Sequence, residues 1–118
     1  MPANNRDSVS LWDMAQAIRR IQEFTAGAAS ETYLESVFMQ SAVERQLGIL
    51  GEAARRVSIE FQQLHPEIDW RNAINLRNLL AHRYNQVNSE VIWNIVTSIL
   101  PSLLVQIEAL LPPLPDDI

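Results

Sequence analysis

Hydrophobic residues recur every three to four positions along most of the chain, and no stretch alternates strictly between hydrophobic and polar residues as a strand would. This spacing places the hydrophobic side chains on one face of a helix. The pattern predicts four main helices with shorter helical turns between them. The expected ranges are about 7–26, 31–34, 37–57, 58–65, 69–84 and 89–111.

The first helix has two candidate start points. Ser10 followed by Asp13 resembles a capping pair, and Asp7 offers an earlier start. Gly27 is the expected C-terminal glycine, because glycine readily adopts the left-handed conformation that ends many helices.

Polar residues and a proline mark the ends of the later helices. Asp69 is the expected N-cap of the third main helix, and Asn88 or Ser89 caps the fourth. Pro101 lies inside the fourth helix, where it either bends the helix or begins a new one.

Two glycines lie inside the predicted helix 37–57. Gly48 and Gly51 each cost about 1 kcal/mol relative to alanine in a helix interior. Their spacing of nearly one turn predicts that another backbone passes close to this face.

These elements predict an all-α fold: an antiparallel up-and-down helical bundle of four to five main helices. The length of 118 residues fits a single domain covering 1–118, with loose tails over 1–6 and 112–118.

Composition narrows the class of protein. The chain has no cysteine, which excludes disulfides and thiolate metal sites and fits a cytoplasmic location. The N-terminus lacks a signal sequence. The most apolar stretch, Val91–Leu111, is interrupted by polar residues and a proline, so no membrane span is expected.

The charge balance constrains any nucleic-acid function. The net charge is −5, and all nine basic residues are arginine. An acidic chain would bind nucleic acid only where its arginines are concentrated. Arginine makes planar contacts with phosphate, although a general bias in residue usage explains the same composition.

The segment from Arg77 to Tyr84 breaks the amphipathic pattern. On one helix, Arg77 shares an otherwise apolar stripe with Trp70, Ala73, Ile74, Leu80, Ala81 and Tyr84, so a buried guanidinium needing a partner is expected. The neighbouring stripe is polar throughout and consists of Arg71, Asn75, Asn78 and His82.

This combination suits metal-independent cleavage of RNA, in which the 2′-hydroxyl attacks the neighbouring phosphate. Histidine transfers protons near neutral pH, and arginine stabilises the developing phosphoryl charge. Arg77 and His82 are five residues apart, about 140° around a straight helix. Their convergence needs a loosened last turn or a second subunit.

The spacing alone favours a purely structural reading. Arg77 would pair with Glu52 or another acidic residue that faces the core, and His82 would cap carbonyls at the helix end. His65 precedes a proline at a helix end and is typical of a capping residue. No histidine or cysteine spacing indicates a metal site.

The residues Leu-Arg-Asn-Leu-Leu-Ala-His-Arg-Tyr at 76–84 contain an arginine–x4–histidine–x–tyrosine motif. Further distinctive segments lie at 18–27, 48–57, 65–71, 90–93 and 100–103. In this order, the motif and the segments resemble those of the HepT-like HEPN ribonuclease toxins over about residues 7–111.

This resemblance implies an antiparallel helical bundle that dimerises around the motif, with endoribonuclease activity that needs no metal and no cofactor. By motif match, Arg77, Asn78 and His82 are the catalytic residues. The expected partners are RNA, a second copy of the chain and a nucleotidyltransferase antitoxin similar to MntA, which transfers AMP groups to Tyr84. Added negative charge there would repel RNA.

Some positions depart from the common family pattern, and alternatives remain. Relatives usually carry other residues at the positions of Asn85, Gln86 and Asn88. These differences affect antitoxin pairing and substrate preference more than the catalytic chemistry. The main alternative is a non-catalytic helical module that docks a nucleotidyltransferase or binds nucleotide. A toxin that has lost its activity is a third.

Overall fold

The computed structural model describes residues 4–81 and 88–112, which form helices without a strand. If the run from 89 to 108 is counted as one helix, the described residues contain six. The elements are α1 (Asn5–Thr25), α2 (Ser30–Glu35), α3 (Val37–Arg56), α4 (Ile59–Leu64), α5 (Trp70–Ala81), α6 (Ser89–Asn94), η2 (Ile95–Ile99) and α7 (Leu100–Glu108).

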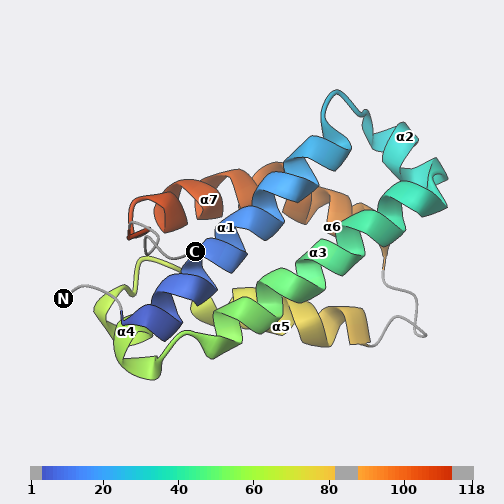
Figure 1. The fold of residues 1–118 in the computed structure, drawn as a ribbon. Helices are drawn as coiled ribbons and strands as arrows, with labels where there is room; N and C mark the ends of the chain where they lie inside the picture. Colours follow the sequence, from blue (N-terminus) through green and yellow to red (C-terminus); the bar gives the residue numbers. More distant parts are fainter. Residues whose placement is uncertain (1–3, 82–87, 113–118) are drawn as a thin grey trace.

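The four long runs lie antiparallel to their neighbours (Figure 1). α3 packs against α1 on one side and α5 on the other, while the run from α6 to α7 returns along α1. The short helices α2 and α4 close opposite ends of the bundle (Figure 1). The all-α prediction is confirmed.

The first helix begins earlier than the capping pair predicted. Asn4 is the N-cap, and its side-chain oxygen accepts a hydrogen bond from the Asp7 backbone N–H at 2.7 Å. The capping role predicted for Ser10 is wrong, because Ser10 lies buried within α1. Residues 4–6, expected in a loose tail, instead cap and begin the helix.

Most other predicted helix ends are confirmed. Asn72 donates its backbone N–H to the Asp69 side chain, and Glu90 donates to that of Asn88. Gly27 adopts a left-handed conformation with φ 74° just after α1. Local sequence therefore determines these boundaries.

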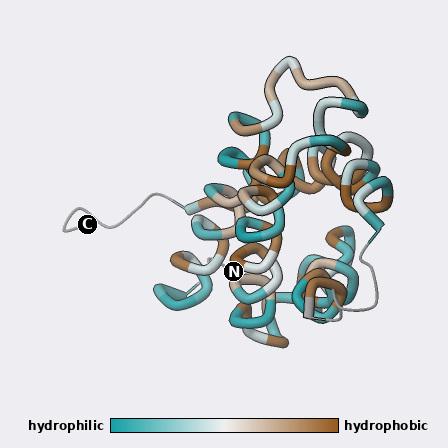
Figure 2. Tube along the Cα trace, turned by 90° about the vertical axis from the view of Figure 1, so that its right-hand side faces the viewer, coloured by the Kyte–Doolittle hydropathy of each residue, from teal (hydrophilic) through white to brown (hydrophobic). Residues whose placement is uncertain are grey.

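Hydrophobic side chains from all the helices meet in one core. In Figure 2 the colour of the tube changes within each turn, as expected for helices with one apolar face. The largest fully enclosed side chains are Tyr33, Leu11, Met14, Ile18, Ile21, Leu47, Leu50, Ile92, Leu100, Ile107 and Val43.

Contacts distant in sequence tie the chain ends to this core. The carboxylate of Asp7 is buried and accepts hydrogen bonds from the backbone and the hydroxyl of Ser58, at 2.8 and 2.7 Å. Trp12 donates its indole N–H to the carbonyl of Pro112 at 2.8 Å. Pro112 was expected to begin a loose tail, and this contact shows that it is anchored.

Pro101 neither breaks the last helix nor leaves it regular. A π-helical stretch, Ile95–Ile99, joins α6 to α7, and the Leu100 N–H donates to the carbonyl of Ile95. Proline lacks an N–H and crowds the carbonyl four residues earlier. The widened π turn accommodates that crowding, so the helix continues from Ser89 to Glu108.

By length and composition, Ser89–Glu108 would suffice to cross a membrane, with a mean hydropathy of 1.5. The expectation that no segment reaches this level is wrong. The finding is weak evidence for a membrane, because the core helix of a soluble protein passes the same test. In this fold, 39% of the most apolar window is buried.

Candidate functional site

The helix that carries the motif is held at its first turn. The ring of Trp70 is buried, and its indole N–H donates to the carbonyl of His65 at 2.9 Å. Ala73 and Leu76 continue the buried face. These contacts fix the direction of α5 as it passes along α3.

The backbones of α3 and α5 approach most closely at Gly51. A Cβ atom built on Gly51 would lie 3.0 Å from the backbone nitrogen of Arg77 and 3.3 Å from the carbonyl oxygen of Ala73. At Gly48 the nearest atom is the end of the Leu80 side chain, 3.9 Å away. The predicted close approach is therefore confirmed at Gly51, and it places Arg77 directly against α3.

Arg77 pairs with Glu52, as the structural reading of the sequence proposed. Its Nη1 lies 3.2 Å from Oε2 of Glu52. The expectation that Arg77 is buried is wrong, because 59% of its side chain is exposed. The buried face of α5 runs through Leu76 instead, so Arg77 lies at the edge of the α3–α5 contact.

Glu52 contacts two further arginines from its own helix. Arg55 donates to both carboxylate oxygens, with its Nε 3.3 Å from Oε2. The Nε of Arg56 lies 3.6 Å from Oε1. The hydrogen bond from Arg55 and the charges of all three arginines lower the pKa of Glu52, so the carboxylate stays ionised at neutral pH.

Arg55 and Arg56 are the residues near the site that the sequence analysis missed. They follow Glu52 by three and four positions, the spacing at which helical side chains meet. That spacing was a sufficient signal for their pairing with Glu52.

The polar stripe of α5 faces solvent over its described part. Arg71, Asn75 and Asn78 are exposed, and the Asn78 amide donates to the Asn75 side chain at 3.5 Å. Asn78 follows Arg77 directly, so their side chains leave the helix about 100° apart. The structure thus places Arg77 towards α3 and Asn78 on the exposed face.

His82 and Tyr84 lie outside the described residues, which stop at Ala81 and resume at Asn88. The convergence of His82 with Arg77, its alternative role as a helix cap, and the placement of Tyr84 stay predictions.

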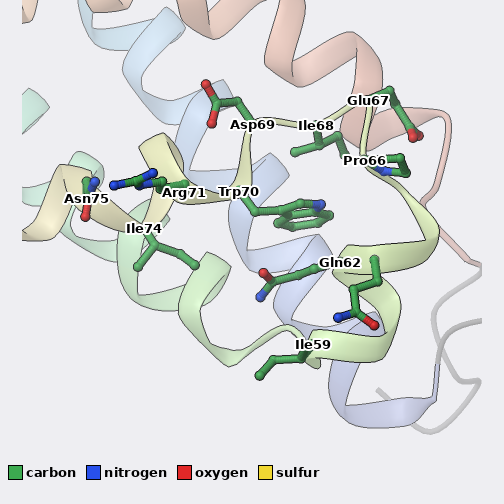
Figure 3. Close-up of a pocket in the computed structure, with 11 residues that line it drawn as sticks. Ile59, Gln62, Pro66, Glu67, Ile68, Asp69, Trp70, Arg71, Ile74 and Asn75 are labelled. Carbon is green, nitrogen blue, oxygen red and sulfur yellow. The ribbon is translucent and has the colours of Figure 1, made fainter.

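Surface hollows border α5 on several sides within the described residues. One of about 610 Å³ lies beside Arg77 between α3 and α5, and its lining includes Glu52, Arg56 and Arg45. A second, of about 770 Å³, lies between α4 and the start of α5, and its lining includes Ile59, Gln62 and Trp70 (Figure 3). The third, of about 580 Å³, is mainly apolar and separates α5 from η2 and α7.

His65 has a local structural role. It ends α4, its ring packs on Phe61 with centroids 4.5 Å apart, and its Nδ1 lies 3.4 Å from Glu67. Among residues 4–81 and 88–112, no three histidine or acidic side chains are grouped to hold a metal.

Comparisons with known proteins point to one family. A model of the family described as "Ribonuclease HepT-like" matches residues 14–110. A Thermococcus cleftensis protein named "Probable ribonuclease HepT" is 41% identical over 100 residues, which cover 85% of this chain and 91% of that protein. A Methanocaldococcus jannaschii protein named a "Putative RNase" is 31% identical, over 86% of this chain and 84% of its own length. No solved structure matches significantly.

Proposed function

Because the chain belongs to the ribonuclease HepT-like family, we propose that it is a metal-independent endoribonuclease and the toxin of a toxin–antitoxin pair. The observation that carries this proposal is the family match over residues 14–110, which spans an uninterrupted arginine–x4–histidine–x–tyrosine motif. Relatives named as ribonucleases support the same activity.

In the proposed reaction, the 2′-hydroxyl of RNA attacks the adjacent phosphorus. A new O2′–P bond forms while the P–O5′ bond breaks, which leaves a 2′,3′-cyclic phosphate and a 5′-hydroxyl. One group must accept the proton of the 2′-hydroxyl and another must protonate the departing 5′ oxygen. We assign proton transfer to His82, whose side chain titrates near neutral pH.

Arg77 would stabilise the extra negative charge on the phosphoryl oxygens, and Asn78 would hold one of those oxygens. The position of Arg77 supports this role. Its side chain is 59% exposed, and it approaches Glu52 through Nη1. A guanidinium has five N–H donors, so donors remain for a phosphate.

We propose that the active form is a homodimer around α5. One motif supplies a single histidine for two proton-transfer steps, and a second copy would supply the other. The apolar hollow beside α5 supports association there, because it exposes Leu79 and Ile99 to solvent. A groove of this kind is stabilised when a partner's apolar side chains cover it.

We also propose that a nucleotidyltransferase antitoxin silences the enzyme in the cytoplasm by adding AMP to Tyr84. Each added phosphodiester brings negative charge close to the position where RNA phosphates would bind. This proposal rests on the motif match alone, since Tyr84 lies outside the described residues.

The decisive experiment uses the two histidines of the chain. Wild type, His82→Ala and His65→Ala are purified without a partner, and mass spectrometry verifies that Tyr84 is unmodified. Each is incubated with total cellular RNA in the presence of a chelator. We expect cleavage by wild type and His65→Ala and none by His82→Ala, because His65 has a local contact role at the end of α4.

Cleavage by all three proteins would refute the role of His82. If the unmodified, folded wild type cut no RNA, the ribonuclease proposal would fail, and the non-catalytic module that docks a nucleotidyltransferase or binds nucleotide would replace it.

Subunit mixing tests whether the site is shared between two chains. Wild type is mixed with increasing amounts of His82→Ala. If one site needs His82 from both chains, every mixed dimer is inactive, and cleavage falls as the square of the wild-type fraction. If each chain holds a complete site, cleavage falls in proportion to that fraction.

A further inference from the structure

Glu52 gathers three guanidinium groups around one carboxylate. Arg55, Arg56 and Arg77 each place a nitrogen within 3.6 Å of it. We call these four residues the arginine cluster. Three positive charges and one negative charge leave a net charge of +2 there, in a chain whose net charge is −5. An acidic protein therefore carries a local excess of positive charge.

The cluster is exposed as well as positively charged. The side chains of Arg55 and Arg56 are each 54% exposed, while that of Glu52 is 26% exposed. Arg55 donates to Glu52 through Nε and Nη2, and Arg56 approaches it through Nε. Each guanidinium has five N–H donors, so both arginines keep donors for a further acceptor.

The backbone holds the cluster in place. Glu52, Arg55 and Arg56 occupy the last two turns of α3. The close approach at Gly51 fixes α5, and with it Arg77, against the same turns. Arginines preorganised by a shared carboxylate lose less side-chain freedom when they bind a phosphate.

The hollow beside the cluster extends away from Arg77 along α3. Arg56 and Arg45 lie eleven positions apart on this helix and both line it. Asp13 and Glu44 also line the hollow, and neither makes an ion pair with an arginine among the described residues. These acidic side chains offset the positive charge in the rest of the hollow. We therefore expect an anion to bind at the arginine cluster and not throughout the hollow.

We propose that Arg55 and Arg56 bind a phosphate of the RNA strand next to the phosphate that Arg77 binds, and that Glu52 holds the three arginines in register. This inference rests on the proposed ribonuclease function and adds a substrate contact outside the motif. Proteins that bind single strands track the backbone with such positive groups, and each phosphate contact makes binding depend on salt.

The test measures binding of a short, mixed-sequence RNA oligonucleotide whose 2′-hydroxyls are methylated, so that it cannot be cleaved. Wild type is compared with Arg55→Gln, Arg56→Gln and Arg20→Gln. Arg20 is an exposed arginine of α1, so its variant matches the change in charge away from the cluster. Circular dichroism verifies that all four proteins have equal helix content.

We expect Arg55→Gln and Arg56→Gln each to weaken binding about tenfold and to reduce the slope of log K against log salt by about 0.7. Arg20→Gln should bind as wild type does. Equal loss in all three variants would overturn the inference, because it would show a general effect of charge. Unchanged binding in both cluster variants, or no binding by wild type, would overturn it as well.

Cleavage of total RNA by the same proteins separates this inference from the proposed function. Wild-type cleavage combined with unchanged binding in both cluster variants would leave the ribonuclease function standing and remove only the second phosphate contact. Absence of wild-type cleavage would remove the function itself.

Discussion

Replacing Gly51 with alanine tests the contact that positions Arg77. The added methyl group would lie 3.0 Å from the Arg77 nitrogen, 3.2 Å from the Arg77 Cβ and 3.3 Å from the Ala73 carbonyl oxygen. Two of these three atoms belong to the backbone of α5, so no flexible side-chain end can move aside. The helix itself has to shift outward by a few tenths of an ångström.

Two opposing effects set the size of the change. Alanine in place of glycine stabilises a helix interior by about 1 kcal/mol. Forcing an extra methyl group into a packed contact costs about 1–3 kcal/mol. The free energy of unfolding of Gly51→Ala should therefore fall by about 0–2 kcal/mol. The shift also moves Arg77 away from Glu52. RNA cleavage should therefore fall by more than the loss of folded protein explains.

Gly48→Ala is the matched control on the same helix. Its methyl group would meet only the Leu80 side chain at 3.9 Å, an ordinary contact distance. We expect it to raise the free energy of unfolding by about 1 kcal/mol and to leave cleavage unchanged. Urea denaturation followed by circular dichroism measures both variants. If Gly51→Ala were stabilised as much as Gly48→Ala, the close approach of the two helices would be refuted.

Three further changes test other parts of the fold. Tyr33→Phe should stabilise the protein by about 1 kcal/mol in urea denaturation, because the enclosed hydroxyl has no hydrogen-bond partner among the described residues. Burial raises the pKa of Tyr33 from 10.0 to about 12, so wild type should lose stability as the pH rises through that interval, and Tyr33→Phe should lose less. Asp7→Ala should lower the thermal midpoint by several degrees, since it leaves the backbone N–H and hydroxyl of half-buried Ser58 without their acceptor, whereas a change within 1 °C would contradict this. Ile99→Asp should shift the protein towards the monomer in sedimentation, while Val105→Asp, which is exposed but outside the apolar hollow, should not.

The sequence predicted features that depend on nearby residues better than those that depend on distant ones. Asp69 and Asn88 were identified as caps because each bonds a backbone group two or three positions away. The capping prediction for Ser10 is wrong, because the same local pattern occurs inside a helix that Asn4 already caps. The bond from Ser58 to Asp7 joins residues 51 positions apart, and no local pattern indicates it.

For the candidate site, too, some predictions are confirmed and others are wrong. The glycine at position 51 predicted that two backbones approach, and the structure gives the partner as Arg77. The apolar stripe predicted that Arg77 is buried, which is wrong because helix periodicity does not show where a helix leaves the core. Glu52 was identified as a partner, while its contacts with Arg55 and Arg56 were missed although their spacing is helical.

The fold offers a physical answer to the conflict between an acidic chain and an RNA substrate. Long-range attraction follows net charge, so at −5 the protein as a whole repels RNA. Screening confines that repulsion to about 10 Å at moderate salt, so contacts within the cluster decide whether a bound strand is held. Placing three of the nine arginines on one carboxylate concentrates charge where the motif lies. RNA affinity should therefore depend on these few residues far more than on the remaining surface, and a substitution outside the cluster should change it little.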